Sequence, residues 1–277
     1  MPLPNLYFII PVFNEAENIP VLFRNLDSAV QQLEDEFLCQ VILIDDGSTD
    51  GSASLAGRMG RGLPVTVLSN PRNLGPGACF ARAFAHLKGL LGTGDWVVTM
   101  EGDNTSSTST LHHMLTRRKE GYEVILASPY TYNGGFSEVS FFRLLASHMA
   151  NSLVKICLGV RGLNTFSSFF RLYDEKVIRR LYNHFGPGIL ECTGFECMVE
   201  MINKLILVGA TVSEVEMKVD WAKRRGKSKM RFMKTVAGYL GLIFKKRKWA
   251  KQGQYRTLSK TINPKRRKRV NQGNEKV

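Results

Sequence analysis

Two acidic motifs in this sequence follow apolar runs and have the residue types that hold a divalent cation. Asp46 closes a carboxylate pair after the apolar residues 41–44, and Glu101 and Asp103 follow the apolar residues 96–100. In an open α/β sheet, ligands bind beyond the carboxyl ends of the strands. Carboxylates placed there can bind Mg²⁺ or Mn²⁺ and, through the ion, a diphosphate. Because a metal-bound diphosphate is a good leaving group, the two motifs predict group-transfer chemistry.

The apolar runs alternate with helical patterns along the chain, and this alternation indicates how the motifs are positioned. It predicts an α/β fold with a mainly parallel sheet and helices on both faces. The expected strands are 6–12, 41–44, 65–68, 96–100, 124–127, 166–173 and 211–219. The expected helices are 17–33, 75–90, 109–119, 139–158 and 196–208. We expect a further short helix that is capped by Asp50 and ends at residue 56. Two acidic clusters at two strand ends therefore suggest one shared polar site.

Charge is divided unevenly between the two ends of the chain. Residues 1–221 carry 18 Lys and Arg against 23 Asp and Glu, whereas residues 222–277 carry 20 Lys and Arg against one acid. We expect one catalytic domain over 1–229 and a basic tail over 230–277. Such a tail binds anionic membrane surfaces or nucleic acid, or is simply solvated. We favour the membrane surface over nucleic acid as the partner.

The segment 230–249 has some membrane character. Its uncharged run 236–244 is far shorter than the roughly 20 apolar residues that span a bilayer. An interfacial helix and a helix packed on the domain both fit this pattern. The five cysteines are scattered, and no basic, apolar leader follows Met1. We therefore expect a reducing, cytoplasmic setting at the periphery of a membrane.

Three motifs in order carry a resemblance to a known family. Pro11-Val12-Phe13-Asn14-Glu15 precedes Asp45-Asp46-Gly47-Ser48-Thr49-Asp50-Gly51, and Glu101-Gly102-Asp103 follows. Together they resemble the family 2 glycosyltransferases, and within them the dolichol- or polyprenyl-phosphate mannosyltransferases. The resemblance runs from about residue 6 to about residue 235. It implies the Rossmann-like GT-A fold, a nucleotide-sugar donor and Mg²⁺ or Mn²⁺ as cofactor.

The resemblance also implies a donor site drawn from five segments. Positions that line the nucleotide pocket in the family match Pro11, Phe13, Glu15, Ile44 and Asp46. The turn 70–77 would contribute Arg72 and backbone N–H groups that cradle phosphate. Glu101 and Asp103 would hold the metal, with Asp103 catalytic and Gly102 allowing close approach of the backbone. Lys223 and Lys229 would close over the diphosphate. Without the resemblance, Glu15 and Asp46 also fit as caps of a helix and a turn.

Some positions depart from the family pattern. Glu101 replaces an aspartate, and its extra methylene makes direct metal coordination less expected than for Asp103. Lys223 replaces an arginine and loses the bidentate fork. Phe13 replaces a tyrosine, and Pro129 stands where an arginine is usual.

The acceptor side has fewer signals. Arg143, Arg225 and Ser228 are candidate acceptor-binding residues. Glu196 and Glu200 lie four residues apart on an expected helix, as a pair of candidate general bases or as a surface acidic pair. A hydroxyl acceptor needs such a base, whereas a phosphate acceptor is already a nucleophile.

We therefore predict an inverting glycosyltransferase. It would move a sugar from GDP-mannose or a UDP-sugar to a polyprenyl or dolichol phosphate at the cytoplasmic membrane face, with a membrane-protein partner as a further option. One alternative is a family 2 enzyme that acts on a sugar or lipid hydroxyl in polysaccharide or glycolipid synthesis. The other is a non-catalytic scaffold that binds nucleic acid or membrane through its basic tail.

Overall fold

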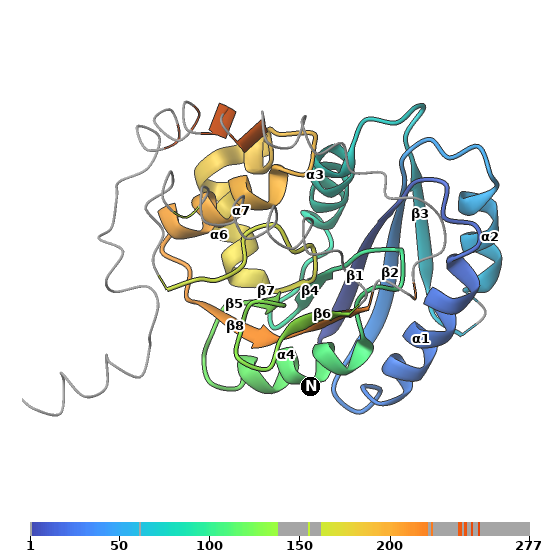
Figure 1. The fold of residues 1–277 in the computed structure, drawn as a ribbon, viewed down its shortest axis with the longest axis horizontal. Coiled ribbons are helices and arrows are strands. Elements are labelled where there is room, and N and C mark those ends of the chain that lie inside the picture. Colours follow the sequence, from blue (N-terminus) through green and yellow to red (C-terminus); the bar gives the residue numbers. More distant parts are fainter. Residues whose placement is uncertain are drawn as a thin grey trace, which may run out of the picture.

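A seven-stranded mixed sheet forms the centre of the molecule (Figure 1). The structure is a computed structural model that describes residues 2–60, 62–137, 155, 162–220, 223, 238–239, 241–242, 245 and 249. The sheet has the strand order β3-β2-β1-β4-β7-β5-β8, and β7 alone among these strands runs antiparallel to its neighbours. The strands are β1 (Asn5–Val12), β2 (Leu38–Asp45), β3 (Val65–Ser69), β4 (Trp96–Thr99), β5 (Val124–Ser128), β7 (Arg171–Asp174) and β8 (Val212–Glu216). The predicted mainly parallel α/β sheet is confirmed.

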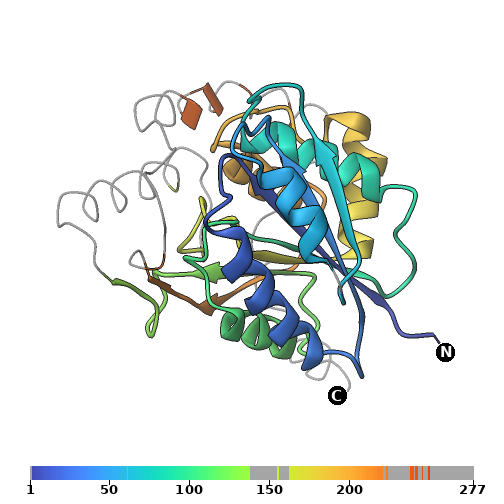
Figure 2. The ribbon, with the colours of Figure 1, turned by 90° about the vertical axis from the view of Figure 1, so that its right-hand side faces the viewer.

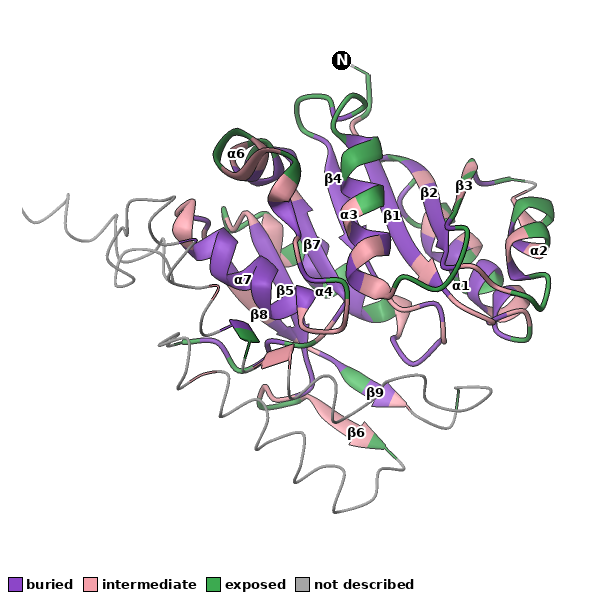
Figure 3. Cartoon of the chain, turned by 90° about the horizontal axis from the view of Figure 1, so that it is seen from above, coloured by how far each residue is buried: buried purple, intermediate pink, exposed green. Residues whose placement is uncertain are grey.

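Helices cover both faces of this sheet (Figures 1 and 2). On one face pack α1 (Ile19–Gln31), α2 (Ser52–Met59) and α4 (Thr108–Arg118). On the other pack α3 (Pro76–Leu87), α6 (Glu175–Phe185) and α7 (Cys197–Leu207), with the short 3₁₀ helix η1 (Gly186–Ile189) after α6. A small parallel pair, β6 (Gly135–Ser137) and β9 (Lys218–Asp220), lies beside the main sheet (Figure 3).

β1 shows why the strands appear in the sequence as continuous apolar runs. Phe8 and Ile10 pack in the core under α1 and α4, whereas Tyr7 and Ile9 pack in the core under α3 and α6. Successive side chains of a strand point to opposite faces, so a strand buried on both faces has no polar positions. The buried residues of Figure 3 accordingly follow the central strands through the molecule.

The strand order places a switch point between β1 and β4. The chain runs outward from β1 through β2 to β3 and returns through α3 to β4 on the opposite side of β1. Connections therefore leave the carboxyl ends of β1 and β4 in opposite directions, and this opens a crevice that binds ligands in such folds. The segment with Glu15, after β1, and the acidic motif of Glu101 and Asp103, after β4, lie at this switch point, and the first acidic motif follows the neighbouring strand β2.

Two expected strands in the second half of the chain need correction, and one helix was missed. The strand expected over 166–173 is confined to β7, because the carbonyls of Phe166 and Ser168 accept hydrogen bonds from the Arg171 side chain (2.7 Å each). The strand expected over 211–219 is divided into β8 and β9 at Met217, whose N–H donates to the Ser128 carbonyl. Helix α6 was not expected, although Asp174 caps it by accepting the N–H of Lys176. The expected helix 139–158 lies outside the described residues, apart from residue 155.

No helix among the described residues is long and apolar enough to cross a membrane. Of the segment 230–249, the described residues include Leu242 and Trp249, and both are buried against the core under α7. Their burial favours a helix packed on the domain over an interfacial one for that part of the segment.

We predict that Arg171→Met lowers the free energy of unfolding by about 3 kcal/mol or more. The Arg171 side chain is fully buried and donates to the carbonyls of Phe166, Ser168 and Met198, so its loss leaves three acceptors without their donor, two of them in fully buried hydrogen bonds. Urea denaturation followed by circular dichroism measures the change. Arg117→Met, which removes an exposed pair with Glu120, is the control and should change stability by less than about 0.5 kcal/mol. Equal losses in the two variants would contradict this account of Arg171.

Candidate functional site

The loops that follow β1 and β2 are joined by hydrogen bonds. The N–H of Asn14 donates to Ser48 Oγ (2.9 Å), and Asn14 Oδ1 accepts the N–H of Thr49 (2.8 Å). The N–H of Glu15 donates to Ser52 Oγ (2.8 Å). Asn14 has a φ of 51°, a left-handed conformation that asparagine tolerates better than most residues. The polar residues after Asp46 therefore hold the two strand-end loops together.

Glu15 is buried at the junction between β1 and α1. Its carbonyl accepts the N–H of Ile19, the first residue of α1, and its carboxylate accepts a hydrogen bond from the Asn18 side-chain amide. The carbonyl of Asn18 in turn accepts the Asn104 side-chain amide (3.0 Å) from the loop after β4. The main chain of Glu15 thus supports the start of α1, whereas its side chain binds that of Asn18 and lies beside the second acidic motif.

Asp46 organises the glycine-rich turn. Its Oδ1 accepts the N–H of Leu74 (2.9 Å) and the side-chain amide of Asn70 (2.8 Å), and its Oδ2 accepts the N–H of Gly75 (2.8 Å). This corrects two expectations. The N–H groups of Leu74 and Gly75, which we expected to bind phosphate, donate to Asp46. The Asp46 carboxylate, which we expected at the nucleotide, is occupied by these bonds and holds the turn in place.

The other residues predicted around the nucleotide differ in exposure. Ile44 has no exposed surface and packs in the core under α3, so its side chain offers nothing to a nucleotide. Pro11 and Phe13, at the end of β1, are partly exposed. Arg72 is exposed, and its backbone lies against the Asp46 turn, since a Cβ at Gly47 would be 2.6 Å from Arg72 Cα. Arg72 is therefore held near the first acidic motif, as expected.

The second acidic motif is packed onto the end of β1. A Cβ at Gly102 would lie 2.8 Å from Val12 Cγ1 and 3.3 Å from the Pro11 carbonyl oxygen. The glycine thus permits a close approach to β1, whereas we expected it to permit approach to a ligand. The packing joins Glu101 and Asp103 to the loop that carries Glu15.

Glu101 and Asp103 present hard oxygen donors at this point. Glu101 accepts hydrogen bonds from Ser106 Oγ (3.0 Å) and from the N–H of Phe169 (3.2 Å). Asp103 Oδ1 accepts the Thr105 hydroxyl (2.7 Å). Burial raises the pKa of the Glu101 carboxyl, and the adjacent Asp103 carboxylate raises it further. A cation bound between the two groups would offset both effects.

The donor set fits a cation that is shared with a substrate. Carboxylate oxygens suit Mg²⁺ and Mn²⁺. Within the part of the chain that the structure describes, no group of three or more His, Cys, Asp or Glu side chains converges on one point. Mg²⁺ is typically bound by one or two carboxylates together with substrate phosphates, which is the arrangement that Glu101 and Asp103 allow. The longer Glu101 side chain reaches the N–H of Phe169, and more direct coordination by Asp103 stays a prediction.

β9 brings the start of the basic segment to this motif. The N–H of Asp220 donates to the Thr105 carbonyl (3.2 Å), and Lys223 Nζ lies 3.9 Å from Asp220 Oδ2. Lys223 is exposed. The other predicted residues of this group and of the acceptor site, namely Arg143, Arg225, Ser228 and Lys229, lie outside the described residues.

The two candidate bases lie in different environments. Glu196 is partly exposed immediately before α7, and its Oε1 accepts the N–H of Gly194 (3.3 Å). Glu200 is fully buried and lies 2.6 Å from Lys204 Nζ. Because its carboxylate is buried and ion-paired, the expected role of Glu200 as a catalytic base is not supported by its position. Glu196 is the residue before α7, whereas Glu200 lies in its first turn, which is buried in the core.

Phe195 and Phe169 connect α7 to the acidic motif. Their rings stack with centroids 5.5 Å apart and an interplanar angle of 16°. Phe169 is the residue whose N–H binds Glu101, and Phe195 immediately precedes Glu196. Sequence reasoning missed Asn70, Ser106, Phe169 and Phe195 as parts of the site. Polar residues close to each motif were a usable signal for the first two, whereas nothing local marks the phenylalanines.

These observations define an α/β protein with a polar site at the carboxyl ends of β1, β2 and β4. A family model described as Glycosyl transferase family 2 matches residues 7–182, and the chain therefore belongs to this family and is a glycosyltransferase. The family part of the resemblance seen in the sequence is confirmed.

Solved structures support the same fold. Glucosyl-3-phosphoglycerate synthase from Mycobacterium tuberculosis, in complex with Mn²⁺, UDP and glucosyl-3-phosphoglycerate, has a TM-score of 0.60 at 15% identity, with 92% of this chain and 81% of that chain covered. Its complex with Mn²⁺, UDP-glucose and glycerol 3-phosphate has a TM-score of 0.57 at 14% identity, with 92% and 82% covered. At this identity the likeness shows the GT-A fold. The finer resemblance to dolichol-phosphate mannosyltransferases stays a prediction.

We predict opposite effects of alanine at two helical glycines. A Cβ at Gly77 of α3 would lie 2.0 Å from the Cys192 carbonyl oxygen, whereas one at Gly57 of α2 would meet nothing within 4 Å. Gly77→Ala should therefore destabilise the fold by roughly 2 kcal/mol or more through overpacking. Gly57→Ala should stabilise it by about 0.5–1 kcal/mol through helix propensity. Thermal or urea unfolding measures both, and stabilisation by Gly77→Ala would show that the close approach of α3 to Cys192 is wrong.

Proposed function

We propose that the chain is an inverting glycosyltransferase that takes a nucleotide-sugar donor together with Mg²⁺ or Mn²⁺ at the carboxyl ends of β1, β2 and β4. One observation carries the proposal: the motif of Glu101 and Asp103 is packed onto the end of β1 at the switch point of the sheet. The solved structures with this fold are described with Mn²⁺ together with UDP or UDP-glucose, which supports the same choice of donor and ion.

Each part of the site has a proposed task. Glu101 and Asp103 would hold the cation, which when bound neutralises charge on the departing diphosphate. Pro11 and Phe13 offer partly exposed surface to the nucleotide base. Lys223 is an exposed cation close to the acidic loop, where it would add positive charge near the diphosphate.

We propose a phosphate-bearing acceptor, with polyprenyl phosphate as our first choice. Phosphoglyceric acid and glycerol 3-phosphate, which are named as bound in the solved structures, also bear phosphate, and because each carries a free hydroxyl as well, they support a phosphate-bearing acceptor but not the choice of attacking group. A phosphate nucleophile needs no general base. This agrees with the burial of Glu200 in an ion pair. The excess of Lys and Arg over residues 222–277 suits an anionic membrane surface, so we propose the cytoplasmic face of a membrane as the place of reaction.

We expect Asp103→Ala to weaken metal-dependent donor binding at least about tenfold, because it removes a proposed metal ligand. Calorimetric titration with UDP-glucose, GDP-mannose and other UDP-sugars, in Mn²⁺ and in EDTA, measures the binding. Asp35→Ala, at an exposed turn after α1, is the control and should bind as the wild type does. Failure of the wild-type protein to bind any donor of a broad panel would overturn the proposed function.

We expect Glu196→Gln to retain transfer to polyprenyl phosphate within about threefold, because a phosphate acceptor needs no proton removed. The rival acceptor is a sugar or lipid hydroxyl with Glu196 as base, and it predicts a loss of roughly 100-fold or more in kcat with donor binding unchanged. Transfer assays with polyprenyl phosphate, 3-phosphoglycerate and polyprenol as acceptors separate the two. A variant that binds donor normally but transfers to none of the acceptors that the wild type uses would favour the rival.

A further inference from the structure

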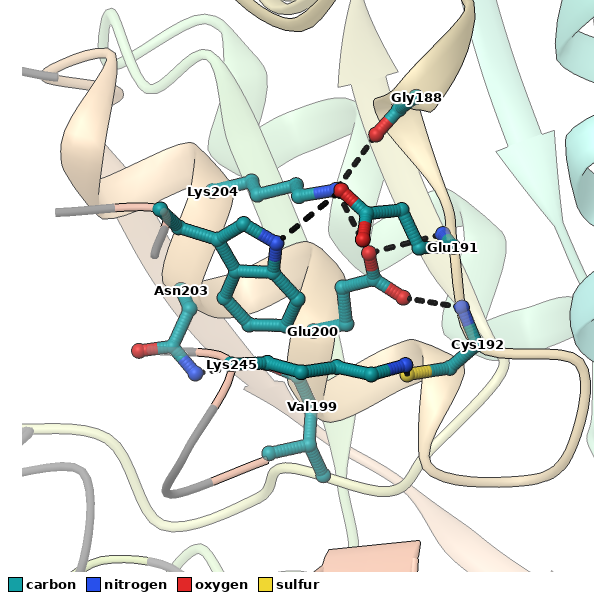
Figure 4. Close-up of polar contacts among 9 residues, drawn as sticks. Gly188, Glu191, Cys192, Val199, Glu200, Asn203, Lys204 and Lys245 are labelled. Atoms are coloured by element: carbon teal, nitrogen blue, oxygen red, sulfur yellow. Dashed lines mark hydrogen bonds and ion pairs between the residues drawn. The ribbon is translucent and has the colours of Figure 1, made fainter. Parts of the chain in front are cut away.

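A buried cluster on α7 lies next to the donor site but contains none of the residues proposed to bind the donor. Lys204 has no exposed surface, and its Nζ lies 2.6 Å from Glu200 Oε1 and 3.6 Å from Glu191 Oε1 (Figure 4). The same ammonium donates to the carbonyl of Gly188 and lies 4.8 Å from the centre of the Trp249 ring. Both side chains of the Glu200–Lys204 pair have no exposed surface.

Glu200 uses its carboxylate to hold two consecutive main-chain groups. Its Oε1 accepts the N–H of Glu191 (2.8 Å), and its Oε2 accepts the N–H of Cys192 (2.7 Å), as Figure 4 shows. Hydrogen bonds to an ionised acceptor are about twice as strong as neutral ones. One carboxylate bound to two successive N–H groups fixes the orientation of both peptide units. Glu200 therefore determines how the chain enters Thr193.

Thr193 passes this constraint to the glycine-rich turn. Its carbonyl accepts the N–H of Gly77 (2.8 Å) at the start of α3. A Cβ at Gly75 would lie 2.4 Å from the same carbonyl oxygen, so the two backbones are in direct contact. The N–H groups of Leu74 and Gly75 bind Asp46, immediately after β2. Between Cys192 and Gly77 the contact runs through main-chain atoms, which leave little freedom for adjustment.

The ion pair adds little net stability by itself. Removing two charges from water offsets most of their attraction, and a buried ion pair is often no more stabilising than apolar residues of the same volume. The pair has a definite geometric consequence, however, since without the carboxylate the N–H groups of Glu191 and Cys192 lose their acceptor. The structure thus favours a positioning role over a purely stabilising one.

We propose that Glu200 and Lys204 are positioning residues of the donor site. Lys204 fixes the Glu200 carboxylate, Glu200 fixes residues 191–193, and Thr193 fixes the turn 74–77, which is also held by Asp46. The inference rests on the proposed function, because it concerns the same donor site. Trp249 Nε1 donates to Glu191 Oε1 (3.2 Å) and Lys245 Nζ lies 3.3 Å from Cys192 Sγ, so residues near the basic tail bind the same unit.

The test compares Glu200→Gln with a matched ion pair elsewhere. Glu175 on α6 is also buried and lies 2.6 Å from Arg179, four residues away, but Arg179 is half exposed and the pair binds no part of the donor site. Hydrogen exchange followed by mass spectrometry reports the amides of residues 74–79 without any ligand. We expect exchange there to rise at least about tenfold in Glu200→Gln and to stay within about twofold of the wild type in Glu175→Gln.

Donor binding and kinetics provide the second measurement. We expect Glu200→Gln to raise the Kd for UDP or GDP with Mn²⁺, and the KM for the donor, about tenfold, with kcat at saturating donor within about threefold. Glu175→Gln should leave all three at wild-type values. Unchanged exchange at 74–79 together with unchanged donor affinity in Glu200→Gln would overturn the inference.

Two further outcomes are distinguishable. If the wild type binds no nucleotide, the proposed function fails, and the exchange measurement still decides whether Glu200 positions the turn. If Glu200→Gln does not fold, Glu200→Asp takes its place, since it keeps the charge but withdraws the carboxylate by one methylene. It should then show faster exchange at 74–79 than Glu175→Gln, and equal exchange in the two would contradict the proposal.

Discussion

The site depends on one buried carboxylate. Asp46 immediately follows β2 and accepts hydrogen bonds from Asn70, Leu74 and Gly75, so the turn into α3 is held against the carboxyl edge of the sheet. A buried carboxylate is tolerated only where such donors replace water. This requirement explains why the turn has a fixed course beside the first acidic motif. It also explains why the turn and the loop after β1, which are far apart in sequence, border the same crevice.

The second acidic motif is placed by packing and not by hydrogen bonds alone. Gly102 brings Glu101 and Asp103 against the end of β1, and the Asn104 amide reaches the Asn18 carbonyl. Glu101 then extends to the Phe169 N–H, and the Phe169 ring stacks on Phe195. The metal-binding candidates are therefore connected to the start of α7, where the partly exposed Glu196 immediately precedes the helix.

The two glutamates at the start of α7 have different environments because the helix passes from the surface into the core. The partly exposed Glu196 lies immediately before the helix, whereas the first turn already enters the core with Glu200, which pairs with Lys204 one turn further on. A residue four positions along a helix returns to the same side but lies about 6 Å further along the axis. At the boundary between crevice and core this translation changes a partly exposed carboxylate into a buried one. Trp249, the last described residue, packs in the same core and donates a hydrogen bond to Glu191, next to the segment that contacts the glycine-rich turn.

The sequence by itself determined the α/β class, most strands and helices, the family and the two acidic motifs, because apolar periodicity and strand-end motifs are local patterns. Only the tertiary structure decided that Asp46 binds the glycine-rich turn, that Ile44 and Glu200 are buried, and that Gly102 packs on β1. It also decided that residues 166–170 bind the Arg171 side chain and form no strand. Each of these depends on partners that the fold brings from other segments. Local spacing fixes which residues share a face of an element, whereas packing between elements fixes what that face meets.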